Sequence, residues 1–347
     1  MVALGTKGEP VEKAGIAIVG YGGFGKKIAE ELEKNPRCQV KYLYHPKPEK
    51  AEAYGAKGTS DWERILNDSE ITAFIIATPN DRHFEILNKL VTKGDRHIFV
   101  EKPMVNTYEE ARATLRASRL LDLRDKVFMV GHNQRREFVF RKAKEFLEAG
   151  KIGRLVSANI NLSTGAAFNI KPDNWRYSAE RHSLGPLSTL GSHSIDTIHY
   201  LFGRVSKLKA SVKNITGKTE APDCGFVMME LENGVTVFLE TKYNSPSEKT
   251  CIITGTDGII YINRNRISLR LGRDVNKVPS KEFWSDERSN NTLKEELDEF
   301  ITAVLRTDSQ LVETGIEEGF STMAILEACR VSASQGSAVD CEIYYCT

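Results

Sequence analysis

Short apolar segments alternate with amphipathic segments through the first third of the chain. Apolar runs predict strands at residues 15–19, 40–44, 73–77, 97–100 and 127–130. Apolar residues at helical spacing predict helices between them, near residues 26–33, 61–66, 81–92 and 108–121. Strands and helices in this order form a parallel sheet covered on both faces, and such a sheet binds ligands at the carboxyl ends of its strands. We therefore expect a doubly wound α/β domain over residues 15–135, after a flexible leader of residues 1–14.

The pattern changes after residue 131. A helix is predicted near residues 138–149, followed by strands near 155–162, 205–212, 225–231, 235–243, 250–254 and 258–262. The pairs Asn233-Gly234 and Asp257-Gly258 are typical of tight hairpin turns, which join antiparallel strands. Two helices, near 293–305 and 316–335, close the chain. We expect residues 136–347 to form a second α/β domain with a large, open, mainly antiparallel sheet, one face of which is free to meet a partner subunit.

Composition narrows the classes of function. A chain of 347 residues is long enough for two domains, and a net charge of +1 gives no footprint for nucleic acid. No apolar run reaches the roughly 18 residues that span a bilayer, and residues 1–14 lack the apolar core of a secretory signal. The six cysteines have no metal-ligand spacing. We expect a cytoplasmic protein with reduced thiols, no metal site, and no nucleic-acid or membrane partner.

The segment after the first strand reads Gly20-Tyr21-Gly22-Gly23-Phe24-Gly25 and leads into a helix. Gly20 permits a tight turn, Gly22 lets the backbone approach a ligand, and Gly25 lets helix and strand pack closely. The N–H groups at the start of the helix attract a pyrophosphate. A glycine turn without a ligand is the alternative, but the flanking strand and helix favour a Rossmann dinucleotide-binding domain.

The end of the second strand bears on the choice of dinucleotide. NAD-binding proteins place an Asp or Glu here for the ribose hydroxyls, whereas this chain reads Tyr44-His45-Pro46-Lys47. The imidazole of His45 and the charge of Lys47 could receive a 2′-phosphate, although both side chains could also simply face water. We expect NADP as the cofactor, with NAD possible.

Polar residues follow two further strands. Thr78-Pro79-Asn80 follows the strand at 73–77, with His83 one helical turn later, and offers short polar groups to a ribose or nicotinamide. Helix capping by Asn80 or Asp81 is an equal alternative. Glu101-Lys102-Pro103 follows the strand at 97–100 and places an ammonium group at the ligand-binding edge of the sheet, where a lysine can transfer a proton or polarise a substrate oxygen.

One helix in the second half carries a candidate histidine. Thr189, His193, Asp196 and Tyr200 lie on one helical face by their spacing. Hydroxyl and carboxylate neighbours could orient His193 as a general acid or base. From this segment alone, a buried histidine at a helix interface is the favoured interpretation.

Taken together, these motifs resemble the Gfo/Idh/MocA oxidoreductase family, which includes glucose–fructose oxidoreductase and inositol dehydrogenase. The matching segments are Gly20–Gly25, Ala77-Thr78-Pro79-Asn80 with His83, Glu101-Lys102-Pro103, Asn174-Trp175-Arg176, Gly191-Ser192-His193 with Asp196, and residues 315–336 with Glu327-Ala328 and Ser332. The resemblance covers nearly the whole chain from Gly15 onward.

The resemblance implies a Rossmann domain followed by a domain whose open sheet mediates dimers or tetramers. Lys102 matches the family lysine that contacts the substrate hydroxyl and the nicotinamide ribose, and the Lys102–Pro103 peptide is often cis in the family. His193 matches the catalytic histidine. The resemblance also implies that Glu101, Trp175 and Arg176 lie near the cofactor and that Arg135 or Arg136 lies near the domain junction. The positions that it implies for substrate binding are Lys102, Arg136, Thr189 and His193.

Thr189 departs from the family pattern, because many family dehydrogenases carry an Asp four residues before the histidine. Threonine cannot act as a carboxylate base near neutral pH, so either proton transfer rests on Lys102 and His193 or catalysis is weak or absent. We expect an NAD(P)-dependent oxidoreductase that transfers a hydride between nicotinamide and a secondary alcohol of a sugar, polyol or sugar derivative. The alternative is a non-catalytic dinucleotide-binding regulatory protein. A narrower form of this hypothesis has a nucleotide-linked sugar as the substrate. Its diphosphate could be bound by four arginines, which could equally be surface or interdomain charges (Arg135, Arg136, Arg176 and Arg181).

Overall fold

The structure is a computed structural model that describes residues 13–272 and 282–346. It divides into two compact units. Of the described residues, the first unit comprises 13–101, 117–130 and 293–315, and the second comprises 102–116, 131–272, 282–292 and 316–346. The expected linear division at residue 135 therefore differs from the observed units, because residues 293–315 return to the first unit and residues 102–116 belong to the second.

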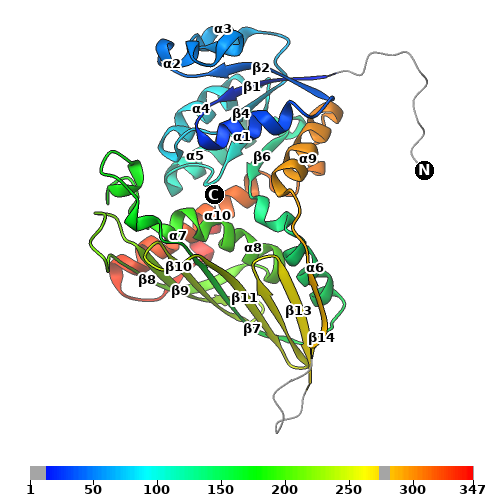
Figure 1. Ribbon diagram of the computed structural model, residues 1–347, viewed down its shortest axis with the longest axis vertical. Coiled ribbons are helices and arrows are strands. Elements are labelled where there is room, and N and C mark those ends of the chain that lie inside the picture. Colours follow the sequence, from blue (N-terminus) through cyan, green and yellow to red (C-terminus); the bar gives the residue numbers. More distant parts are fainter. Residues whose placement is uncertain (1–12, 273–281, 347) are drawn as a thin grey trace, which may run out of the picture. The chain divides into compact units, whose positions relative to one another are not determined.

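The first sheet has the strand order β3-β2-β1-β4-β5-β6 (Figure 1). Its strands are β1 (Ala14–Val19), β2 (Cys38–Tyr44), β3 (Gly58–Thr59), β4 (Ala73–Ile76), β5 (His97–Glu101) and β6 (Phe128–Gly131). The pairings from β3 to β5 are parallel, and the chain changes its direction of travel across the sheet between β1 and β4. This strand order confirms the Rossmann-type sheet and places a ligand-binding crevice at the carboxyl ends of β1 and β4.

The helices of this part of the chain are α1 (Gly23–Leu32), α2 (Pro48–Glu52), α3 (Trp62–Asn67), α4 (His83–Lys93) and α5 (Tyr108–Leu120). Four of the five were predicted from helical spacing. The sequence did not reveal α2 or β3, because segments of five and two residues are too short to show a period.

The core of the first unit includes a helix from the far end of the sequence. All six residues of β1 are buried, as expected for a central strand covered on both faces. The helix α9 (Thr292–Arg306) adds Leu297, Phe300 and Ile301 to the same apolar cluster, and the rings of Phe300 and Phe99 lie 5.6 Å apart. This apolar face explains why residues 293–315 join the first unit.

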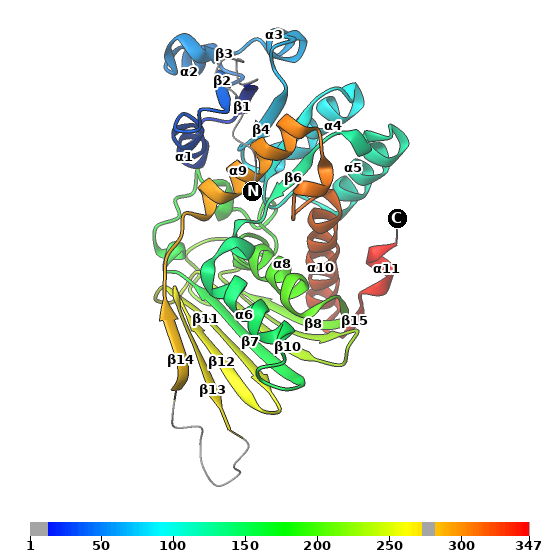
Figure 2. The ribbon, with the colours of Figure 1, turned by 90° about the vertical axis from the view of Figure 1, so that its right-hand side faces the viewer.

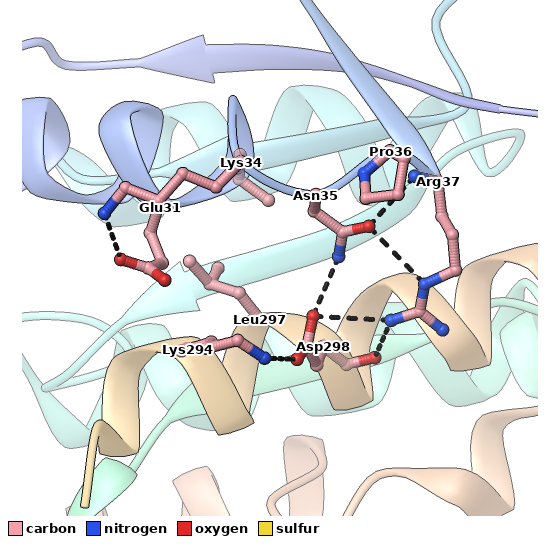
Figure 3. Close-up of a pocket in the computed structure, with 9 residues that line it drawn as sticks. Glu31, Lys34, Asn35, Pro36, Arg37, Lys294, Leu297 and Asp298 are labelled. Carbon is pink, nitrogen blue, oxygen red and sulfur yellow. Dashed lines mark hydrogen bonds and ion pairs between the residues drawn. The ribbon is translucent and has the colours of Figure 1, made fainter.

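A polar network fixes α9 to the turn between α1 and β2 (Figure 3). The Asn35 amide donates to Asp298 Oδ1 at 2.8 Å, and Asn35 Oδ1 accepts the backbone N–H of Arg37 at 2.9 Å. The Arg37 guanidinium donates to Asp298 Oδ1 at 3.3 Å and to the Thr302 hydroxyl at 2.8 Å. Asn35 therefore joins the turn and the helix through both ends of its amide.

The second unit is built on a nine-stranded sheet of order β14-β13-β12-β11-β7-β10-β9-β8-β15. Its strands are β7 (Leu155–Ser163), β8 (Val205–Lys213), β9 (Cys224–Leu231), β10 (Thr236–Lys242), β11 (Glu248–Gly255), β12 (Gly258–Asn263), β13 (Arg266–Leu271), β14 (Glu282–Glu287) and β15 (Val339–Asp340). The described pairings are antiparallel except for β7 with β10. The structure confirms the mainly antiparallel sheet and adds β13, β14 and β15, which were not predicted.

Helices cover one face of this sheet (Figure 2). They are α6 (Phe138–Glu148), α7 (Pro186–Thr189), α8 (Gly191–Phe202) and α10 (Ile316–Gln335), with the short α11 (Glu342–Tyr345) near the end of the chain. Strand β9 alternates buried and exposed side chains, which is typical of a sheet with one covered face. Large apolar side chains are exposed on five positions of the sheet strands (Val156, Phe226, Met228, Phe238 and Ile252).

The described ranges 13–272 and 282–346 contain no helix with the length and apolar character needed to cross a membrane. Within the same ranges, no group of three or more His, Cys, Asp or Glu side chains is placed to hold a metal ion. Each of the six cysteines is a free thiol, and all except Cys346 are buried.

We expect Asn35→Ala to lower the stability of the protein by about 1–2 kcal/mol, because it leaves Asp298 and the Arg37 N–H without their amide partner. Lys34→Ala is the matched control: Lys34 forms an exposed ion pair with Glu31 and should change stability by less than about 0.5 kcal/mol. Chemical denaturation of both variants measures the difference. Equal stability of the two variants would show that the network does not hold α9.

Candidate functional site

The glycine turn between β1 and α1 has the geometry of a phosphate-binding turn. Gly20 has φ +97°, and a Cβ there would lie 2.7 Å from the Thr78 nitrogen. A Cβ on Gly25 would lie 2.1 Å from the Gly20 carbonyl oxygen, so both positions require glycine. Gly22, just before α1, faces open space: a Cβ there would meet no other part of the described chain within 4 Å. The turn therefore leaves room for a ligand where the N–H groups of the helix begin.

A pocket of about 760 Å³ opens beside this turn. Six of the predicted cofactor-binding residues line it: Gly20, Tyr21, Gly22, His45, Thr78 and Pro79. Eleven others were not predicted: Val19, Tyr44, Pro46, Lys50, Tyr54, Trp62, Ala77, Arg82, Glu85, Ile86 and Lys89. The predicted residues Gly23, Phe24, Gly25, Lys47, Asn80, His83 and Glu101 are not among the lining residues. Cofactor contacts at these positions stay predictions.

The electrostatics of the pocket favour an anion. Its charged lining residues are three cations, Lys50, Arg82 and Lys89, and one acid, Glu85. Glu85 accepts from Lys89 at 3.0 Å and lies 4.0 Å from Arg82, so it partly neutralises those two side chains. Lys50 projects from α2, the short helix that the sequence pattern did not reveal.

His45 lies where β2 ends. Its Nδ1 accepts the backbone N–H of Lys47 at 3.0 Å, which makes Nδ1 the unprotonated nitrogen of the neutral ring and leaves Nε2 as the donor. Burial and then the charge of Lys50 lower the pKa of His45, so the imidazole is neutral at pH 7. The positive charge at this end of the pocket therefore comes from Lys50.

A buried histidine stabilises the turn after β4. His83 is 1% exposed, and its Nε2 lies 2.9 Å from the Thr78 carbonyl, so its imidazole holds the turn together. Thr78 lines the pocket, and its buried hydroxyl has no hydrogen-bond partner among the described residues.

In the second unit, the structure brings Lys102 and His193 together. Lys102 follows β5 directly, and the Lys102–Pro103 peptide is cis, as the family resemblance led us to expect. The Lys102 ammonium donates to the Thr189 carbonyl at 3.0 Å. Thr189 ends α7 and His193 lies in the first turn of α8, so two helices that meet end to end place both groups.

His193 is a neutral base in this setting. Burial, followed by the charge of Lys102 and the effects of His132 and Lys249, lowers its pKa well below the usual value. Its Nδ1 has no hydrogen-bond partner in the described part of the chain. A neutral imidazole beside an ammonium group can accept a proton from a hydroxyl that the ammonium also contacts.

His132 is a member of this cluster that was not predicted. It follows β6, at the carboxyl end of a strand of the first sheet, which is the same kind of position as Lys102 and could have been noticed for that reason. Burial lowers its pKa to about 4 against the opposing effect of Asp196, and neither ring nitrogen has a partner among the described residues. His132 is therefore a second neutral imidazole near His193.

Asp196 does not orient His193, which was the alternative to a buried histidine at a helix interface. Its two carboxylate oxygens accept from Arg135 Nε and Nη2, each at 2.7 Å, and its side chain is fully buried. The pair is bidentate, which is the strongest geometry for an ion pair of this kind. Because Arg135 is committed to Asp196, it does not fit the idea of a diphosphate-binding arginine.

The remaining predicted residues have local roles. Arg136 is 2% exposed, and its Nη1 donates to the His132 carbonyl at 3.3 Å, which fits a structural role; substrate contact stays a prediction. The Arg176 guanidinium lies 4.5 Å from the Trp175 ring, and the Arg176 N–H donates to Asn174. The Trp175 ring lies 5.1 Å from His182, a buried histidine that was not among the predicted residues.

Two family models match the chain. Residues 14–132 match the oxidoreductase family with an NAD-binding Rossmann fold, and residues 140–261 match the GFO/IDH/MocA C-terminal domain. The chain belongs to the Gfo/Idh/MocA oxidoreductase family. The resemblance inferred from the motifs is thereby confirmed, together with the Rossmann fold and the second α/β domain.

Two of the similar proteins are named as enzymes that act on sugar derivatives. Levoglucosan dehydrogenase of Pseudarthrobacter phenanthrenivorans is 30% identical over 264 residues, which are 68% of this chain and 65% of that protein. The chain therefore matches about two thirds of the length of that relative. The 2,7-anhydro-N-acetylneuraminate hydratase of Escherichia coli is 24% identical over 301 residues, 81% of this chain and 77% of that protein.

Solved structures of other proteins share this fold over most of the chain. The complex of levoglucosan dehydrogenase with NADH and levoglucosan has a TM-score of 0.85 and 25% identity, covering 95% of this chain and all of that one. An oxidoreductase from Desulfitobacterium hafniense, described as NADPH-dependent, has a TM-score of 0.88 at 22% identity and covers 96% of this chain and 99% of that one, which shows a shared fold.

We expect the protein to lose stability in mild acid. Burial lowers the pKa of His97, His132, His182 and His199 to about 4 in each case. The unfolded state therefore binds more protons below a pH of about 6.5, and the free energy of unfolding falls as pH drops from there toward 4. Each histidine contributes up to about 1.4 kcal/mol per pH unit. Chemical denaturation at pH 7, 6 and 5 measures the slope.

His97→Gln is the control for this prediction. In the wild-type protein, the Val127 N–H donates to His97 Nδ1 at 3.0 Å. The side-chain oxygen of a glutamine can still accept this N–H, but glutamine cannot titrate. We expect a shallower slope, smaller by about one proton. The same pH dependence in both proteins would contradict the assignment of His97 as a neutral buried group.

Proposed function

We propose that this protein is an NAD(P)-dependent oxidoreductase that oxidises or reduces a secondary alcohol carbon of a sugar, a polyol or a sugar derivative. The observation that carries the proposal is the cluster of Lys102, the Thr189 carbonyl and neutral His193. An ammonium donor and a proton acceptor side by side are what oxidation of an alcohol requires of the protein. The named relatives that act on anhydro sugars support a carbohydrate substrate.

The residues divide the chemistry between them. Nicotinamide, when bound, supplies or accepts the hydride. In the direction of oxidation, Lys102 donates a hydrogen bond to the reacting oxygen and stabilises its developing negative charge. His193 accepts the hydroxyl proton as the carbon loses its hydride, so the alcohol becomes a ketone with atoms and charge balanced. In reduction, protonated His193 returns the proton to the oxygen.

Electrostatics suit His193 to this task. Its pKa is lowered by burial and by Lys102, so the ring is unprotonated at pH 7 and ready to accept a proton. The same environment makes the imidazolium a strong acid, which helps return the proton in the reverse direction. The family aspartate is replaced by Thr189, and the one buried carboxylate of α8, Asp196, is bound to Arg135.

We expect Lys102→Met to reduce turnover by at least about a hundredfold and to leave cofactor binding intact, because the variant keeps the length of the side chain and loses its charge. Lys151→Met, an exposed lysine of the second unit, is the matched control. The assay follows nicotinamide absorbance with levoglucosan, inositols and free aldoses as substrates.

Two outcomes would oppose this proposal. Full turnover in Lys102→Met would remove Lys102 from the reaction. Tight cofactor binding by the wild-type protein without turnover on any substrate would favour the alternative, a dinucleotide-binding regulatory protein.

For the cofactor, we propose NADP in preference to NAD. The lining of the pocket at the end of β2 contains no Asp or Glu in residues 44–46, and Lys50 supplies a cation there. A 2′-phosphate is an anion, and Lys50 with the His45 ring could receive it. The NADH complexes of levoglucosan dehydrogenase show that a relative binds the other dinucleotide, so the choice needs a direct test.

We expect Lys50→Ala to weaken NADPH binding by about tenfold and NADH binding by less than about twofold, since only NADPH carries the 2′-phosphate. Lys47→Ala is the control, because Lys47 is exposed and does not line the pocket. Fluorescence titration gives both dissociation constants. Tighter binding of NADH than of NADPH by the wild-type protein would overturn the proposal, and a stronger effect of Lys47→Ala would transfer the role to Lys47.

We also propose that the exposed face of the nine-stranded sheet joins subunits into a homodimer or homotetramer. Four large apolar side chains are exposed on strands β9, β10 and β11 at positions that alternate with buried residues (Phe226, Met228, Phe238 and Ile252). Exposed apolar groups gathered on one sheet are typical of a protein–protein interface. A cytoplasmic location remains our prediction from the sequence.

A further inference from the structure

Thr189 is bound at both of its polar groups. Its carbonyl accepts the Lys102 ammonium at 3.0 Å and the Ser192 hydroxyl at 3.2 Å. Its own hydroxyl lies 2.5 Å from the hydroxyl of Tyr243. Thr189 occupies the position where many family dehydrogenases carry an aspartate, so the partner of its side chain bears directly on the site.

Tyr243 is itself held in place from several directions. It follows β10 directly and is 6% exposed. Its backbone N–H donates to the Asp223 carbonyl at 2.8 Å, and its own carbonyl accepts the N–H of Ala167 at 2.9 Å. Its ring lies 6.1 Å from the ring of His182. The phenol hydroxyl therefore extends from a fixed strand end to Thr189.

We propose that Tyr243 is a positioning residue of the catalytic site. Its hydroxyl fixes the Thr189 side chain and, through it, the end of α7. The carbonyl of the same residue is then aimed at the Lys102 ammonium, which holds that group beside His193. Tyr243 acts through Thr189, and this inference rests on the function proposed above for Lys102 and His193.

The physical reason lies in the nature of the acceptor. A carboxylate attracts an ammonium group over a range of orientations, because it carries a full charge. A neutral carbonyl binds strongly only when its oxygen is well directed, since hydrogen bonds weaken as the geometry departs from linear. Without a carboxylate at residue 189, the hydrogen bond between Lys102 and this residue depends on the orientation of the Thr189 peptide group, and the bond from Tyr243 restricts that orientation.

The same residue also contacts the loop between β7 and α7. Ala167 and His182 both belong to this loop, which we expect to contribute to the substrate pocket. The ring and backbone of Tyr243 support this loop, whereas its hydroxyl supports Thr189. Removing only the hydroxyl should therefore affect kcat much more than KM.

The test compares Tyr243→Phe, Thr189→Val and the double variant, each of which removes the same hydroxyl–hydroxyl bond. We expect kcat to fall by about tenfold in each single variant, with KM changed by less than about threefold. The double variant should lose no more than either single variant, because the shared bond can be lost only once. Thr189→Ser restores a hydroxyl and should recover activity relative to Thr189→Val.

Tyr261→Phe, on strand β12 of the same sheet, is the matched control and should match the wild-type protein. Two kinetic results would overturn the proposal: kcat of Tyr243→Phe within twofold of wild type, or single-variant losses that multiply in the double variant. A change in KM with kcat unaltered would assign Tyr243 to the loop and would also overturn it.

A crystal structure of Tyr243→Phe separates this inference from the proposed function. We expect the distance between Lys102 Nζ and the Thr189 carbonyl to lengthen beyond about 3.5 Å, the limit of a hydrogen bond. An unchanged distance would overturn the inference even if the enzyme is active. A lengthened distance would support it even if no substrate had been found, in which case only the proposed function would fail.

Discussion

The hydrogen bond from the Lys102 ammonium to the Thr189 carbonyl is the contact on which the candidate site depends. It places a full positive charge next to His193 without an opposing carboxylate at residue 189. That charge, together with burial, keeps the imidazole neutral. In the reaction that we propose, this one arrangement supplies both a hydrogen-bond donor for the reacting oxygen and a proton acceptor for its hydroxyl hydrogen.

The buried carboxylate of α8 is neutralised by an arginine. The single buried carboxylate near His193 on α8, Asp196, is bound by both of its oxygens to Arg135. Buried charges of opposite sign are tolerated when their hydrogen-bonding groups are satisfied, and here the bidentate geometry provides that. His132 lies close by but is neutral, because burial lowers its pKa to about 4. Lys102 is left as the dominant charge beside His193.

The features of the first unit suit the binding of a large anion. The conformation of Gly20 and the close approach of Gly25 bring the start of α1 against the end of β4, and Gly22 leaves open space in front of the helix. Backbone N–H groups supply the attraction there, and Lys50 adds a side-chain cation at the far end of β2. The return of α9 to this unit, fixed by Phe300 and by the Asn35 network, completes its core.

The sequence by itself determined the alternation of strands and helices and the glycine turn, and it singled out Lys102 and His193 as candidate site residues. These features depend on short-range patterns, namely apolar periodicity, backbone freedom at glycine, and polar residues placed at strand ends. The strands β3, β13, β14 and β15 and the helix α2 were not predicted, because they are short or weakly patterned. Only the tertiary structure decided that α9 packs in the first unit, that Asp196 binds Arg135 instead of His193, and that Tyr243 bonds to Thr189. These contacts join residues 54 to 263 positions apart in the chain, and such pairings leave no periodic signal because folding alone brings their partners together.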